Sequence, residues 1–284
     1  MVIQSWNARD VLKNEKTEQL IKGAATLGVD IGSRQSKAVL LYQDSVYAAI
    51  TASDVDSKKT ADRLLKKLLK ESGAKLEDIS AVCGTGYGRV ALDFGDIDTK
   101  IVTEISCHAM GAHYLNPNVK TIIDIGGQDC KAIKVDGNTG HVLEFTMNDK
   151  CAAGTGRFLE KTAEMLDYSV EEIGEKVLTS QKSLQISSQC VVFAESEIIS
   201  LKARGEKRED IAAGIHYAVA RRIKNLVKRL DLEPDLLFSG GVSHNPGMCK
   251  ALEETLKMPI TNPNFDTVYC GALGAAIYAK EGNE

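Results

Sequence analysis

The segment Asp124-Ile125-Gly126-Gly127-Gln128-Asp129 decides the fold, because a shorter counterpart, Asp30-Ile31-Gly32-Ser33, stands earlier in the chain. Each segment closes an apolar run that predicts a buried strand, and two further β-like runs follow it. A unit that opens with a strand, an aspartate and a glycine turn therefore occurs twice, which indicates an internal duplication. We expect two such halves to face each other across a nucleotide cleft between domains.

Both glycine loops have the composition of a phosphate-binding site. Glycine lets backbone N–H groups approach a phosphate, because no Cβ stands in the way. We expect Gly32 to lie against the phosphate, Ser33 to donate its hydroxyl and Lys37 to reach a phosphate oxygen. One such loop would most simply be a turn, whereas two matched loops favour nucleotide binding. Further glycines of this kind are expected at Gly126, Gly127, Gly240 and Gly241.

The acidic side chains of the loops suit a metal ion and a water molecule. Asp30 and Asp124 are expected to hold Mg²⁺ through water, because magnesium gives up its hydration shell reluctantly. Gln128 and Asp129 would orient an attacking water. No G-x-x-x-x-G-K-[ST] motif is present, and Gly84-Thr85-Gly86-Tyr87-Gly88 lacks the G-x-G-x-x-G spacing, so that segment is expected to be a structural turn.

Composition limits the classes of function. The 284 residues suffice for two domains, and 43% of them are hydrophobic. A net charge of −4 gives no reason to expect nucleic-acid binding, and no apolar run is long enough for a membrane span. The seven cysteines include no C-x-x-C pair, which favours a reducing, cytoplasmic location over a disulfide framework.

The hydrophobic pattern predicts alternating strands and helices. A polar leader, residues 1–25, is expected to form an extra helix and a linker, without the apolar stretch of a signal peptide. Strands are predicted at 27–31, 38–42, 46–51, 79–83, 121–125, 131–135, 141–147, 185–193 and 236–238. Helices are predicted at 57–71, 103–114, 154–166, 170–178, 210–230, 248–257 and 271–280.

With these motifs the chain resembles the acetate kinase, sugar kinase, heat-shock chaperone and actin superfamily. More narrowly, it is similar to the ATPase activators of 2-hydroxyacyl-CoA dehydratases and the ATPase subunits of benzoyl-CoA reductases. The resemblance runs from Leu27 to Lys280. Its most specific segments are 124–129, 148–158, 187–197, Gly240-Gly241 and 271–276, which also makes Gly271 an expected nucleotide contact.

The resemblance implies an α/β fold of two duplicated actin-like, ribonuclease H-like domains with ATP between them. On this basis residues 26–118 and 271–284 form subdomain I, and residues 119–270 form subdomain II. It also implies a homodimer that shares one [4Fe–4S] cluster, with Cys151 and Cys190 of each copy as ligands. Cys151 precedes the expected start of a helix, whose partial positive charge favours an anionic cluster.

The implied activity is electron transfer driven by ATP hydrolysis. Ferredoxin or flavodoxin would reduce the cluster, and the electron would pass to a partner iron–sulfur reductase or 2-hydroxyacyl-CoA dehydratase. Two alternatives remain open: a small-molecule kinase of the same superfamily, and a non-redox ATPase in which the cysteines are incidental. The 39 residues between Cys151 and Cys190 match no recognised metal signature, so the resemblance alone carries the ligand assignment.

Overall fold

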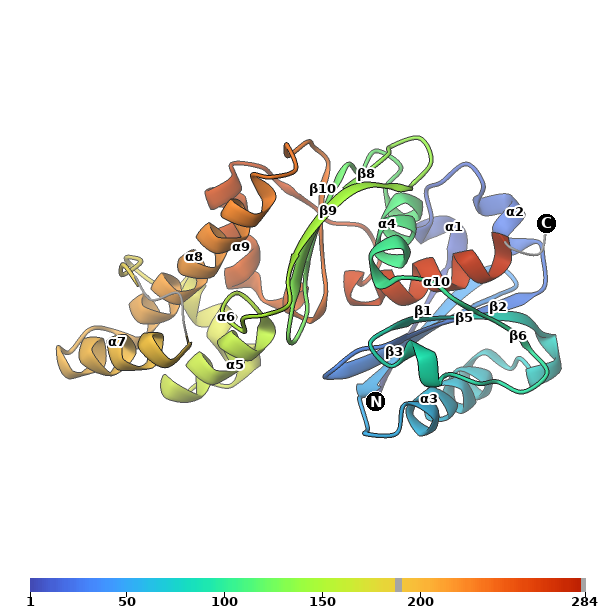
Figure 1. Cartoon of the computed structure of the whole chain (residues 1–284), viewed down its shortest axis with the longest axis horizontal. Helices are drawn as coiled ribbons and strands as arrows, with labels where there is room; N and C mark the ends of the chain where they lie inside the picture. The colour runs from blue at the N-terminus through green and yellow to red at the C-terminus, as the bar shows by residue number, and fades with distance from the viewer. Residues whose placement is uncertain (187–190, 282–284) are drawn as a thin grey trace. The chain divides into compact units, whose positions relative to one another are not determined.

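The computed structural model describes residues 1–186 and 191–281, apart from the side chains of Val191 and Val192. The chain divides into two compact units, which Figure 1 shows as parts of one ribbon. The first unit contains Met1–Ile122, Val135–Leu143 and Asn262–Glu284, and the second contains Ile123–Lys134 and Glu144–Thr261.

A six-stranded sheet forms the centre of the first unit. Its strands are β1 (Val2–Asn7), β2 (Ala25–Ile31), β3 (Gln35–Tyr42), β4 (Ser45–Ala52), β5 (Ile79–Gly86) and β6 (Asp98–Ile101). They lie in the order β1-β4-β3-β2-β5-β6. The pairs β2/β3 and β3/β4 are antiparallel, as short hairpins require, whereas β5 runs parallel to β2 and to β6.

Helices cover both faces of this sheet. Leu27 and Val29 of β2 pack in one cluster with the apolar stripe of α3 (Ser57–Ser72). The alternate residue Thr26 points to the other face, where its hydroxyl donates to the carbonyl of Ala276 in α10 (Cys270–Glu281) at 3.0 Å. The remaining helical segments of this unit are α1 (Ala8–Val11), α2 (Thr17–Ile21), α4 (Glu104–Leu115) and the 3₁₀ turns η1 (Leu76–Asp78), η2 (Arg89–Ala91) and η4 (Thr267–Tyr269).

The leader does not form the single helix and linker that the sequence predicted. Its first residues form β1, which pairs antiparallel with β4 from Val2↔Ile50 to Asn7↔Ser45, and only two short helices follow. The side chain of Trp6 stacks on Phe265, with ring centroids 4.5 Å apart. The polar strand is therefore stabilised by pairing with a distant strand, which its own sequence could not reveal.

The second unit repeats the strand order of the first. Its strands are β7 (Thr121–Ile125), β8 (Cys130–Val135), β9 (Val142–Asn148), β10 (Leu236–Ser239) and β11 (Ile260–Thr261). The order β9-β8-β7-β10-β11 corresponds to β4-β3-β2-β5-β6, element by element. The predicted internal duplication of an α/β fold is confirmed, and β1 is an addition to the first copy.

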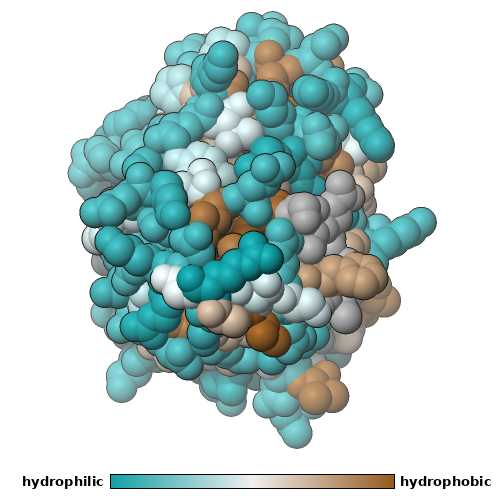
Figure 2. All heavy atoms as spheres, turned by 90° about the vertical axis from the view of Figure 1, so that its left-hand side faces the viewer, coloured by the Kyte–Doolittle hydropathy of each residue, from teal (hydrophilic) through white to brown (hydrophobic). Residues whose placement is uncertain are grey.

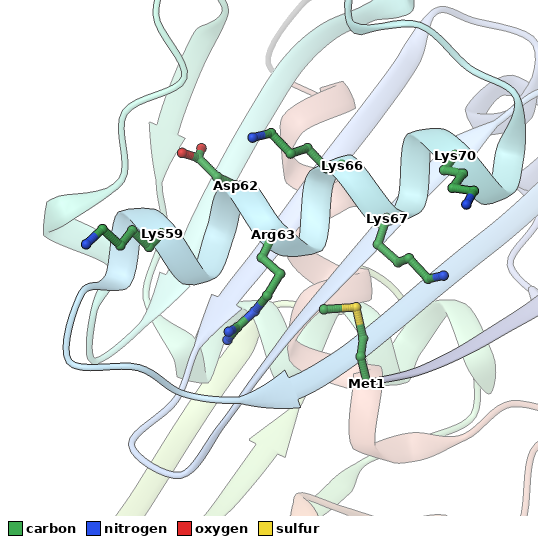
Figure 3. A pocket seen from close by; sticks show the side chains of 7 residues that line it. All are labelled: Met1, Lys59, Asp62, Arg63, Lys66, Lys67 and Lys70. Atoms are coloured by element: carbon green, nitrogen blue, oxygen red, sulfur yellow. The ribbon is translucent and has the colours of Figure 1, made fainter.

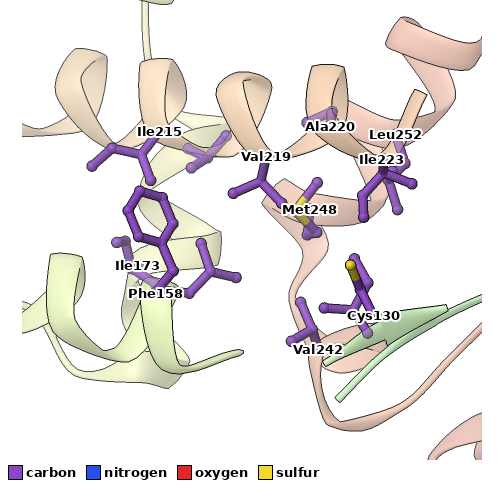
Figure 4. Packing of buried hydrophobic residues seen from close by; sticks show 14 of the residues in the cluster. Cys130, Phe158, Ile173, Ile215, Val219, Ala220, Ile223, Val242, Met248 and Leu252 are labelled. Atoms are coloured by element: carbon purple, nitrogen blue, oxygen red, sulfur yellow. The ribbon is translucent and has the colours of Figure 1, made fainter. Parts of the chain in front are cut away.

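An apolar core holds the helices of the second unit on its sheet. In Figure 4, Val219 and Ile223 of α8 (Arg208–Val227) lie close to Met248 of α9 (Pro246–Leu256), and Ile215 lies close to Phe158 of α5 (Gly156–Met165). These side chains are all buried. The other helical segments are α6 (Val170–Leu178), α7 (Val191–Ala203) and the 3₁₀ turn η3 (Gly241–His244).

The predicted strand at 185–193 is wrong. Gln185 and Ile186 have no regular structure, residues 187–190 lie outside the described residues, and α7 already begins at Val191. A run of β-branched and aromatic residues suggested a strand, yet the same apolar residues continue into a helix, and periodicity alone cannot separate the two.

Large apolar side chains are also exposed on this unit. Phe193 of α7 is 68% exposed and Ile199 is 57% exposed. The face in Figure 2 is mainly hydrophilic, and its hydrophobic residues lie in separate spots. Within the described ranges, no helix has both the length and the apolarity needed to cross a bilayer.

Candidate functional site

The first glycine loop joins β2 to β3 and places an aspartate opposite a lysine. Asp30 and Lys37 are paired residues of the β2/β3 register, and Lys37 Nζ lies 3.5 Å from Asp30 Oδ2. Asp30 is buried, and its Oδ1 has no hydrogen-bond partner among the described residues. Gly32 is partly buried and Ser33 is exposed at the turn that follows. Lys37 therefore neutralises the Asp30 carboxylate, whose Oδ1 can still accept a hydrogen bond.

A glycine of the neighbouring strand lies directly against this aspartate. Gly86, at the end of β5, has φ +83°, and a Cβ there would lie 2.5 Å from Asp30 Oδ1. Any larger residue would both strain the backbone and displace the carboxylate. Gly86 was predicted to belong to a merely structural turn; its contact with Asp30 makes it a residue of the site, and the sequence did not identify it as one.

The second loop has the same construction with an additional acid. Lys131 Nζ lies 3.2 Å from Asp124 Oδ2 and 2.8 Å from Asp129 Oδ2, and all three side chains are buried. The hydroxyl of Ser239 donates to Asp124 Oδ1 at 3.1 Å. Lys131 and Ser239 were not predicted as site residues. The signal for Lys131 was available, because it follows Asp124 by seven residues, as Lys37 follows Asp30.

Gly240 stands beside Asp124 as Gly86 stands beside Asp30. Its φ is +86°, and a Cβ would lie 2.7 Å from Asp124 Oδ1 and 2.4 Å from the carbonyl oxygen of Ile125. The following Gly241 is exposed and begins η3. The predicted residues Asp124, Asp129 and Gly240 thus come together at the carboxyl ends of β7 and β10.

The other predicted residues occupy different surroundings. Gln128 is exposed between Gly127 and the buried Asp129. Gly126 leaves room for Asp129, because a Cβ on it would lie 2.8 Å from Asp129 Oδ1. Gly271 is buried within α10, where a Cβ would lie 2.8 Å from His108 Nε2. Close packing of α10 on α4 therefore accounts for that glycine.

The segment that carries Cys151 connects β9 to α5. Cys151 is partly exposed and forms no disulfide. The side-chain amide of Asn148 donates to the carbonyl of Cys151 at 2.9 Å, and Gly154 turns the chain with φ +95°. The N–H of Gly156, the first residue of α5, donates to the carbonyl of Gly126 at 2.8 Å. The N–H of Arg157 likewise donates to the carbonyl of Gly127 at 3.0 Å. The cysteine segment is thus attached directly to the second glycine loop.

The other cysteines differ from Cys151. Cys190 lies outside the described residues, immediately before Val191, where α7 begins. Cys130 is buried, and desolvation raises the pKa of its thiol to about 11, so it remains protonated at neutral pH. This environment favours a structural role for Cys130 over that of a thiolate ligand.

Known proteins resemble this chain over most of its length. It is 46% identical over 258 residues to the activator of lactoyl-CoA dehydratase from Anaerotignum propionicum, covering 90% of this chain and 97% of that protein. Component A of (R)-2-hydroxyglutaryl-CoA dehydratase from Acidaminococcus fermentans superposes with a TM-score of 0.86 at 43% identity, covering 92% of this chain and all of that one.

Two further structures extend the comparison. The activator of 2-hydroxyisocaproyl-CoA dehydratase from Clostridium difficile, solved with bound ADPNP, has a TM-score of 0.83 at 44% identity, covering 91% of this chain and 97% of that chain. A ROK family glucokinase from Streptomyces griseus has a TM-score of 0.56 at 15% identity, covering 91% of this chain and all of that chain, which shows a common α/β fold. The model of the BadF/BadG/BcrA/BcrD ATPase family matches residues 27–279, and this chain belongs to that family.

Proposed function

We propose that the chain is a homodimeric, ATP-hydrolysing iron–sulfur protein that transfers low-potential electrons to a partner iron–sulfur reductase or 2-hydroxyacyl-CoA dehydratase. The observation that carries the proposal is the hydrogen-bonded attachment of the Cys151 segment to a glycine loop that holds a buried Asp–Lys pair. The names of the relatives, activators of dehydratases, suggest the kind of partner.

ATP with Mg²⁺ would use the acidic groups of the two loops. Magnesium prefers carboxylate and water oxygens, and the unpartnered, buried Asp30 Oδ1 is an acceptor that fits a metal-bound water. Asp124 has both oxygens engaged, by Ser239 and Lys131, which fixes its orientation. Asp129 and Gln128 are proposed to position the attacking water, and Gly32, Ser33, Gly126, Gly127, Gly240 and Gly241 to contact the nucleotide.

Lys37 and Lys131 would change partners when nucleotide binds. In the apo protein each pairs with a loop aspartate. A phosphate and its magnesium ion bring both charges into the loop, so each lysine can donate to a phosphate oxygen while the ion compensates the aspartate. The buried carboxylates would therefore be compensated in both states, by the lysines before nucleotide binds and by the magnesium ion afterwards.

The cluster is proposed to use Cys151 and Cys190 of each copy. A [4Fe–4S] cluster supplies one-electron chemistry at low potential when bound, and it requires thiolate ligands. Cys151 fits this requirement, since it is partly exposed, forms no disulfide and is followed by small residues before the N-terminus of α5. Two thiolates from one chain cannot complete a four-cysteine set, so a second copy is needed.

The nucleotide bound at the second glycine loop would change the position of the cysteine segment through backbone hydrogen bonds. The carbonyls of Gly126 and Gly127 accept from the first two N–H groups of α5. A shift of the loop on phosphate release therefore moves the start of that helix, with the segment that precedes it. Changes in hydrogen bonding and exposure around a cluster alter its potential, and about 59 mV is a tenfold change in a one-electron equilibrium.

Anaerobic purification tests the proposal. The protein is expected to be brown, to form dimers and to contain about four irons per dimer, as one shared cluster requires. Cys151→Ser should lose the iron while retaining ATP binding. Cys249→Ser is the matched control, because Cys249 is also partly exposed in the second unit and is expected to be structural.

Colourless, iron-free anaerobic protein that still hydrolyses ATP would favour the non-redox ATPase. Stoichiometric phosphorylation of a small molecule would favour the kinase. Unchanged iron in Cys151→Ser would refute the ligand assignment.

A further inference from the structure

A hollow of about 550 Å³ lies beside the Cys151 segment, entirely within the second unit. Met147 and Asn148 form one side of it, and Ala153 and Gly154, which follow Cys151, contribute to its wall. Residues of α8 and of the segment just after it also line the hollow. The hollow is therefore adjacent to the proposed cluster ligand.

The lining of this hollow is cationic. Arg221, Arg222 and Arg229 contribute three guanidinium groups, and no aspartate or glutamate is among the described residues that line the hollow. Arg221 and Arg229 are exposed, and neither forms an ion pair within the part of the chain that the structure describes. On a chain with a net charge of −4, this is a local excess of positive charge.

The cationic side chains also contact the segments that carry the cysteines. The side chain of Arg222 covers Gly154, because a Cβ on Gly154 would lie 3.1 Å from Arg222 Cδ. Arg221 donates to the carbonyl of Ile186 at 3.3 Å, the last described residue before 187–190. Anything that binds to this arginine surface is therefore held next to the Cys151 segment.

We propose that an arginine surface, formed by Arg221 of α8, Arg229 just after α8 and the hollow beside them, is the docking surface for an acidic electron-donor protein. The inference rests on the proposed function. Guanidinium groups bind carboxylates through paired N–H donors, and a cluster of one charge steers a partner of the opposite charge. A donor bound here would lie beside Cys151, and a cluster held by that residue would supply one-electron chemistry, accepting one electron from the donor's reduced centre with no bond made or broken.

A second cationic surface provides an internal control. A hollow of about 540 Å³ in the first unit is lined by Met1 and by α3, which contributes five cationic side chains and Asp62. Figure 3 shows Arg63 and Lys67 pointing toward Met1, whereas Lys66 points away from it. Lys66 and Lys70 are exposed and form no ion pair among the residues described. No cysteine is among the described residues that line this hollow. Charge reversal here therefore tests the effect of charge on donor binding without proximity to the proposed cluster.

The test compares two variants of equal charge change. Anaerobic holoprotein carrying Arg221→Glu and Arg229→Glu is titrated with a strongly acidic flavodoxin, and Lys66→Glu with Lys70→Glu serves as the control. We expect the first variant to bind flavodoxin at least about tenfold more weakly and to lose most of the salt dependence of association. The control should remain within about twofold of the wild type. Reduction by dithionite, a small reductant, should be unchanged in both.

Each remaining outcome decides the inference. Equal weakening in both variants would show non-specific attraction and overturn it, as would unchanged binding in the arginine variant. Conversion of the arginine variant to a monomer would assign the surface to a second copy instead. Arg229→Glu alone repeats the test if the double variant fails to fold, since the side chain of Arg229 forms no hydrogen bond or ion pair with the residues that the structure describes. Iron is measured on the same samples, so a missing cluster counts against the proposed function, whereas binding alone decides the docking surface.

Discussion

The two lysines that face the loop aspartates differ in burial. The side chain of Lys131 is 2% exposed and touches two carboxylates, whereas that of Lys37 is 12% exposed and lies 3.5 Å from one. Removing one member of a buried ion pair leaves the other charge uncompensated. The folded state loses more stability when the remaining charge is more completely shielded from water. The repeated pair therefore has unequal structural importance in the two units.

Lys131→Met should lower the free energy of unfolding of the apo protein by about 3–5 kcal/mol, the usual cost of breaking a buried pair. Lys37→Met should cost less, about 1–3 kcal/mol, because the Lys37 side chain is more exposed and lies 3.5 Å from a single carboxylate. Urea unfolding of both variants without nucleotide measures the difference. Equal losses would contradict the assignment of unequal burial.

His216 in α8 introduces a dependence on pH. Burial lowers its pKa from 6.5 to about 4, although its Nδ1 donates to the carbonyl of Ala212 at 2.8 Å. The unfolded chain therefore binds more protons between these values, and stability falls as the pH is lowered through this window.

The wild type should lose about 2 kcal/mol of stability from this histidine between pH 7 and pH 5. His216→Met removes the titrating group and should flatten that part of the profile. Urea midpoints at the two pH values provide the measurement, and parallel profiles would show that His216 does not titrate in this range.

At the scale of elements, β1 is the part of the first sheet that the second sheet lacks. It adds to β4 at the edge of the sheet and places Trp6 against Phe265 and Tyr269. Trp6 is the only tryptophan in the chain, so its fluorescence reports on this strand alone.

Phe265→Ala should shift the Trp6 emission to longer wavelength, because water replaces the stacked ring, and should cost about 3 kcal/mol of stability. Phe94→Ala, which removes a partly buried ring from the α3 side of the sheet, is the control and should leave the emission unchanged. An unshifted emission in Phe265→Ala would mean that β1 is not docked at this position.

At the scale of the whole molecule, each of the duplicated units contains one glycine loop with a paired aspartate and lysine. The glycines Gly86 and Gly240 occupy the same place against the two aspartates, with φ of +83° and +86°. The shared strand order thus extends to the residues of the candidate site, and we infer that both copies retain a role in ATP chemistry.

Asp30→Asn and Asp124→Asn should each reduce ATP hydrolysis at least about a hundredfold, because both carboxylates are proposed to act on the same metal and nucleotide. The double variant should be little worse than either single one, as expected for residues that work as a unit. Exposed Asp98→Asn should retain wild-type turnover. Phosphate release provides the assay, and multiplicative losses would indicate independent roles.

The sequence by itself determined the duplication, the two glycine loops and most of the helices. The spacing of hydrophobic residues along the chain shows which face of a helix or strand is buried. The bounds of α6, Val170 and Leu178, were predicted in this way. The positions of Asp30 and Asp124 at strand ends followed from the same pattern. Only the tertiary structure placed β1 on β4, Ser239 against Asp124 and Gly86 against Asp30. Those relations depend on strand pairing between residues far apart in the chain, and no local period encodes which distant strand lies alongside.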